Sequence, residues 1–96
     1  ILRGDMPLVH WEEVKNQFIL DVRNPQEVEV ETVPGAVNIP LPQLRSRLNE
    51  LPKDREICVY CRSAQRSYYG TRILLQNGFK AKNISGGMLA RSHKVD

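Results

Sequence analysis

The residues best suited to chemistry are a cysteine and an arginine in the stretch Tyr60-Cys61-Arg62-Ser63-Ala64-Gln65-Arg66-Ser67. Cys61 ends an apolar run typical of a buried strand, and Arg66 follows five residues later, just before a stretch with helical spacing. In parallel α/β sheets, ligand sites form beyond the C-terminal ends of the strands. A cysteine placed there is a candidate nucleophile, provided that it is ionised.

Three features of this stretch favour the thiolate of Cys61. Successive backbone N–H groups of a curled loop can form an anion-binding nest. A helix beginning near Ser67 adds the positive end of its dipole, and Arg62 and Arg66 carry full charges. We therefore expect the pKa of Cys61 to lie well below the ~8.5 of a free cysteine, so that no histidine base is needed. Arg62 also suits a surface charge, Arg66 a loop anchor and Ser67 a helix cap.

The elements that must position these residues alternate between strands and helices. Strands are predicted at Phe18–Val22, Ala36–Ile39, Glu56–Tyr60 and Ala81–Ile84, after a short apolar start at Leu8-Val9. Helices are predicted from Asn24, which can act as the N-cap, over Leu44–Leu51 and over Ser67–Asn77. This alternation predicts an α/β class with a mainly parallel central sheet of about five short strands.

Composition sets limits on what the chain can do. Its 96 residues suit a single domain, 1–96, and 41% hydrophobic and 26% charged residues are typical of a globular protein. The longest apolar run, Ile57–Cys61, is far shorter than the ~20 residues of a membrane span. The net charge of +3 is scattered and aromatic residues are few, which argues against a nucleic-acid partner. Because the chain starts with Ile, we expect it to be part of a longer protein.

Five segments in order resemble the single-domain rhodanese family, over about Ile19 to Gly87. Each is weak alone, but together they are specific. They are Leu20-Asp21-Val22-Arg23 with Glu27, Pro34–Pro40, Cys61–Ser67, Gly78-Phe79 and Ser85-Gly86-Gly87.

The resemblance implies a three-layer rhodanese-like fold and sulfane-sulfur transfer. Cys61 would be the catalytic residue, taking sulfur from thiosulfate or a related small anionic donor as a persulfide and passing it to cyanide or a thiol. The backbone amides of the loop would bind the anionic sulfur species; the loop residues are Arg62, Ser63, Ala64, Gln65, Arg66 and Ser67. No metal or organic cofactor is implied.

Two other functions remain as alternatives. The chain could be a regulatory or sulfur-relay module of a larger protein, acting with a partner protein or a fused domain. Phosphatases that resemble this family space cysteine and arginine as C-x5-R, whereas only four residues separate Cys61 from Arg66 here. The shorter loop fits a persulfide better than a phosphate and argues against phosphatase chemistry.

Several local features carry further expectations. Ala64 stands where many relatives have glycine, so a positive φ there would strain the loop. Arg23 and Glu27 have the i, i+4 spacing of a helical ion pair. Cys58 is predicted to be a core thiol rather than a partner of Cys61, and reduced cysteines suit a cytoplasmic location. Close packing against the sheet is the expected reason for Gly70 within a helix.

Overall fold

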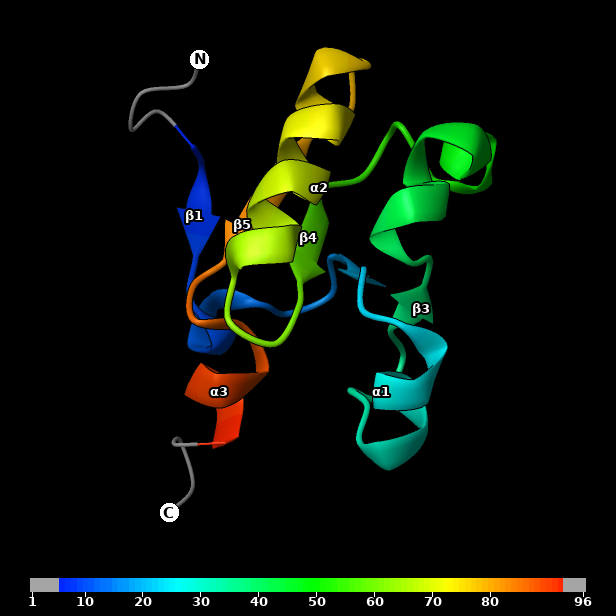
Figure 1. The fold of residues 1–96 in the computed structure, drawn as a ribbon. Helices are drawn as coiled ribbons and strands as arrows, with labels where there is room; N and C mark the ends of the chain where they lie inside the picture. The colour runs from blue at the N-terminus through cyan, green and yellow to red at the C-terminus, as the bar shows by residue number, and fades with distance from the viewer. Residues whose placement is uncertain (1–5, 93–96) are drawn as a thin grey trace.

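A five-stranded parallel sheet forms the centre of the computed structural model, which describes residues 6–92 (Figure 1). The strand order is β1-β5-β4-β2-β3, and every pair of neighbours is parallel. The strands are β1 Leu8–Val9, β2 Phe18–Asp21, β3 Val37–Asn38, β4 Ile57–Tyr60 and β5 Ala81–Ile84. The predicted α/β class with a parallel sheet is confirmed.

Helical segments connect the strands and cover the sheet (Figure 1). They are η1 Trp11–Glu13, α1 Pro25–Val30, η2 Leu41–Glu50, α2 Gln65–Gln76 and α3 Gly87–Ser92. None of the helices in the described part is long and apolar enough to cross a membrane.

The core lies in two clusters, one on each face of the sheet. Side chains alternate between faces along a strand, and β4 shows this directly. Ile57 and Val59 pack in the cluster beneath α2 and η2, whereas Cys58 and Tyr60 pack in the other with Trp11. A strand buried on both faces explains the unbroken apolar run at the centre of the sequence. The layers are those expected of the three-layer fold.

The strand register brings the functional candidates to one edge of the sheet. Asp21, the last residue of β2, lies opposite Tyr60, the last residue of β4. The chain segments that follow both strands therefore meet at the C-terminal edge, where Cys61 begins its loop. This is the edge that sequence reasoning selected.

Two helical segments differ from expectation. The segment around Leu44 is a 3-10 helix broken at Arg47, whose φ of −121° is not helical. Pro42 lies in its first turn and lacks the amide donor. Leu44 is nevertheless buried, so the predicted apolar face is in place. The helix α3, Gly87–Ser92, was not predicted.

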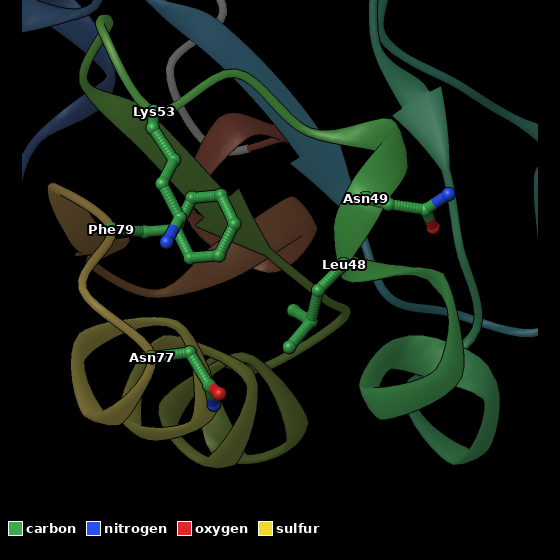
Figure 2. A pocket seen from close by; sticks show the side chains of 5 residues that line it. All are labelled: Leu48, Asn49, Lys53, Asn77 and Phe79. Atoms are coloured by element: carbon green, nitrogen blue, oxygen red, sulfur yellow. The ribbon is translucent and has the colours of Figure 1, made fainter.

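A pocket of about 280 Å³ lies at the far end of α2 from Cys61 (Figure 2). Figure 2 shows the Lys53 side chain extended across the Phe79 ring, and its Nζ lies 5.0 Å from the ring centroid. Leu48, Asn49 and Asn77 complete the lining. No cysteine lines this pocket, and it is separate from the edge that carries Cys61.

Candidate active site

Cys61 directly follows β4, is fully buried and lies within a tightly curled loop. The backbone N–H groups of Ala64 and Ser67 both donate to its Sγ, each over 3.2 Å. Two amides that converge on one atom form the anion-binding nest expected from the sequence. The loop is therefore arranged to stabilise negative charge on sulfur.

Ala64 makes the curl possible by adopting a left-handed conformation, with φ at +91°. Among residues 6–92 it is the only non-glycine residue with positive φ. The expected strain at this position is present, because an L-residue in this region costs roughly 1–2 kcal/mol. The helix α2 then begins at Gln65, two residues earlier than the predicted Ser67.

The pKa of Cys61 is lowered from its ordinary value of 9.0. Burial opposes ionisation, but hydrogen bonding to the Ser67 hydroxyl and to the amides of Ser67, Ser63 and Ala64 outweighs it. Cys58, two residues into β4, shows the opposite case. Burial raises the pKa of its thiol to about 11. The two cysteines thus differ in environment: hydrogen bonds favour the thiolate of Cys61, whereas burial favours the neutral thiol of Cys58.

Ser67 is buried, and its hydroxyl extends the site to the neighbouring strand. Its Oγ lies 3.5 Å from Cys61 Sγ and donates to Asn83 Oδ1 over 2.5 Å. It is not the N-cap of α2, because Ala64 holds that position. Asn83, on β5, was not predicted as a site residue.

Arg66 anchors the loop instead of pointing to an open anion site. Its guanidinium makes a bidentate pair with Glu27 of α1, with N–O distances of 2.7 and 2.9 Å. The hydrogen bond from Arg66, together with the Asn24 amide, lowers the pKa of Glu27 to about 2 despite partial burial. Of the two roles open to Arg66, the structure favours the loop anchor.

The expected ion pair between Arg23 and Glu27 is wrong. Arg23 pairs with the buried Asp21, with Nη2 to Oδ2 at 2.8 Å, and the same carboxylate accepts a hydrogen bond from the Tyr60 hydroxyl. The i, i+4 rule applies within a helix, and Arg23 precedes the N-cap of α1 at Asn24. This buried network fixes the end of β2 beside the loop.

Gly87, the first residue of α3, and Gly86 before it allow the backbone of α3 to approach the loop closely. The amides of Met88 and Leu89 donate to the carbonyls of Cys61 and Arg62, at 2.9 and 3.0 Å. A Cβ on Gly87 would collide with the Cys61 carbonyl oxygen and lie 2.8 Å from that of Arg62. The loop is thus held from α1, β5 and α3.

The other predicted loop residues face outward. Arg62, Ser63 and Gln65 are exposed. Arg62 borders a pocket of about 390 Å³ beside the loop. Its other lining residues come from the segment after β2, from α1 and the residue that follows it, and from α3; they are Arg23, Glu27, Val30, Glu31, Met88 and Leu89. No group of three or more His, Cys, Asp or Glu side chains in the described ranges is placed to hold a metal ion.

The parallel sheet and the buried cysteine in a narrow amide-lined loop fit the rhodanese-like fold expected from the sequence. The family model for the rhodanese-like domain matches residues 8–93, and the chain belongs to this family. It is 34% identical over 79 residues to a sulfurtransferase of Allochromatium vinosum, covering 81% of this chain and 74% of that one.

Solved structures agree. A rhodanese-related protein from Thermoplasma volcanium superposes with a TM-score of 0.86 at 26% identity, covering 92% of both chains. A NAD-dependent persulfide reductase from A. fulgidus has a TM-score of 0.80 at 40% identity. There the match covers 91% of this chain but 16% of the reductase, so this fold also occurs as part of longer chains.

Proposed function

We propose that the protein is a sulfurtransferase that carries a sulfane sulfur as a persulfide on Cys61. The observation that supports this most directly is the pair of amides, from Ala64 and Ser67, aimed at Cys61 Sγ. Such donors stabilise an anionic sulfur, both the attacking thiolate and the terminal sulfur of a persulfide. Membership of the rhodanese-like family supports the same chemistry.

In the first step, the Cys61 thiolate attacks the outer sulfur of thiosulfate. A bond forms between the two sulfurs, the bond inside thiosulfate breaks, and sulfite leaves with the electron pair. The product is Cys61 persulfide, whose terminal sulfur keeps the negative charge. The step uses no general base, because the loop amides that donate to Cys61 Sγ lower its pKa and favour the attacking thiolate.

In the second step, an acceptor attacks the terminal sulfur of the persulfide. With cyanide the products are thiocyanate and the Cys61 thiolate, which closes the cycle; a thiol acceptor takes the sulfur as its own persulfide. The pocket beside Arg62 gives a small donor or acceptor room next to the loop. The remaining loop amides and the exposed Arg62 guanidinium would bind its charge.

The test is the intact mass of the chain after incubation with thiosulfate and removal of excess reagent. We expect wild type to gain the mass of one sulfur atom, Cys61→Ser to gain none, and Cys58→Ser to gain as much as wild type. Cys58 is the matched control, because it is a buried cysteine on β4, the strand that Cys61 directly follows. If wild type acquires no sulfur from thiosulfate or from an organic persulfide, the proposal fails.

The second candidate, a relay module of a larger protein, is favoured by one observation. The chain matches 16% of the A. fulgidus persulfide reductase, so domains of this kind occur beside other domains. In that role residues 1–96 form one domain that exchanges sulfur with a partner protein or a fused neighbour. Sulfur loading without turnover on cyanide or small thiols supports this role over independent catalysis. Both functions suit a reducing compartment such as the cytoplasm, since Cys58 and Cys61 are free.

A further inference from the structure

Asn83 is a buried polar residue on β5, and both ends of its side chain are hydrogen bonded. Its Oδ1 accepts from the Ser67 hydroxyl over 2.5 Å, and its Nδ2 donates to the Ala64 carbonyl over 3.3 Å. Asn83 is only 4% exposed. Burying a carboxamide is costly unless its polar atoms are paired, so these bonds account for its presence in the core.

The Asn83 side chain hydrogen bonds to Ser67 and Ala64, and the backbone amides of both residues donate to Cys61 Sγ over 3.2 Å. We propose that Asn83 is a positioning residue that clamps Ala64 and Ser67, and through them holds the sulfur-binding loop closed around Cys61. Its side-chain hydrogen bonds go to Ser67 and Ala64, and it does not line the pocket beside Arg62, so its effect on the chemistry passes through the loop.

The clamp explains how the loop tolerates alanine at a position that favours glycine. Ala64 has φ at +91°, a strained conformation for an L-residue. Its carbonyl accepts the Tyr68 amide at 3.1 Å and the Asn83 amide at 3.3 Å. Bonds from two sides fix the orientation of this peptide group and oppose its relaxation to negative φ. Without the hydrogen bond from Asn83, the Ala64 N–H would be less firmly directed at the sulfur.

Because Asn83 also contacts Ser67, the direction in which the pKa of Cys61 changes when Asn83 is removed distinguishes two explanations. The Ser67 hydroxyl has a single proton, and both Asn83 Oδ1 and the Cys61 thiolate attract it. If Asn83 mainly drew that proton away from sulfur, removing Asn83 would make the thiolate more stable. The clamp predicts the opposite result, because the loosened amides stabilise the thiolate less.

The experiment measures the rate at which iodoacetamide alkylates Cys61 as a function of pH. Peptide mass mapping identifies which cysteine is alkylated. Asn83→Ala should raise the midpoint of the profile by about one pH unit, a tenfold loss of thiolate at pH values below the midpoint. Asn83→Ser serves if the alanine variant does not fold. Alkylation of Cys58 reports opening of the core, because this thiol is fully buried on β4.

A rescue variant separates positioning from general loosening. Glycine adopts positive φ without strain, so Ala64→Gly makes the loop less dependent on the clamp. In that background, Asn83→Ala should shift the midpoint by about half as much or less. The matched control is Asn77→Ala, which removes a carboxamide bonded to Ile73 O at the other end of α2 and should leave the midpoint in place.

An unchanged or lowered midpoint in Asn83→Ala overturns the proposal, as does a shift of equal size in the Ala64→Gly background. The proposal rests on Cys61 being the reactive thiol of the proposed function, but its readout needs no sulfur transfer. A chain that shows the predicted alkylation pattern and never acquires sulfur contradicts the proposed function alone.

Discussion

The Glu27–Arg66 pair provides a quantitative prediction for the variant Glu27→Gln. The substitution keeps the shape of the side chain but removes the charge that holds Arg66. A pKa of about 2 in place of 4.5 corresponds to roughly 3 kcal/mol of stability at about 1.4 kcal/mol per pH unit, before screening by solvent. Because the two side chains are 30% and 33% exposed, screening reduces this value. We expect Glu27→Gln to lose about 1–2 kcal/mol at pH 7.

The pH dependence follows from the direction of the shift. Glu27 has a lower pKa in the folded chain than in the unfolded chain. Its contribution to the free energy of unfolding is therefore complete above pH 4.5 and is lost as the pH falls toward 2. Urea denaturation of wild type and variant at several pH values measures the difference. The two curves should converge between pH 4.5 and pH 2.

The control is Glu50→Gln, which removes a bidentate partner of Arg47 on the exposed surface and should leave stability unchanged. Equal stability of wild type and Glu27→Gln at pH 7 would refute the reasoning. A difference that persists undiminished at pH 2 would also refute it, because the lost interaction would then not be ionic.

Three further substitutions test other parts of the account, each by urea denaturation. Gly87→Ala should lower the free energy of unfolding by at least about 2 kcal/mol and slow sulfur loading, because positive φ and a clash with the loop carbonyls add together. The control Gly35→Ala has positive φ but open space around the added Cβ, so it should cost about half as much or less. Equal losses of stability in the two variants would contradict the clash. Tyr60→Phe should cost about 1–2 kcal/mol through the lost bond to buried Asp21 while sulfur loading continues, and an unchanged stability would show that this bond contributes nothing. Gly70→Ala should stabilise the chain by up to about 1 kcal/mol, because the added Cβ meets its neighbours at 3.4 Å or more; destabilisation would show that close packing does require glycine.

The features that depend on neighbouring residues could be predicted from the sequence. The apolar run of β4 ends at Cys61, and a strand that ends in a parallel sheet delivers its next residue to the ligand edge. The substitution of alanine for glycine at position 64 pointed to the one left-handed non-glycine residue in the described part of the chain. For Gly70 the expectation of tight packing is not needed, since a Cβ there makes only ordinary contacts.

Long-range partners could not be predicted in this way. Glu27 and Arg66 are 39 residues apart, and no periodicity joins them. The local rule instead paired Glu27 with Arg23, which prefers the buried carboxylate of Asp21. The role of Asn83 could not be predicted either. A polar residue in a short strand is recognised as a loop contact only once the strand register places it beside the loop.

The central claim is tested most directly by locating the sulfur that the chain takes from thiosulfate. Peptide mass mapping of the treated protein should show one additional sulfur atom, located on Cys61. Addition of cyanide should remove this sulfur and release an equal amount of thiocyanate. Sulfur found on Cys58, or on neither cysteine, would contradict the assignment of the loop as a persulfide-carrying site.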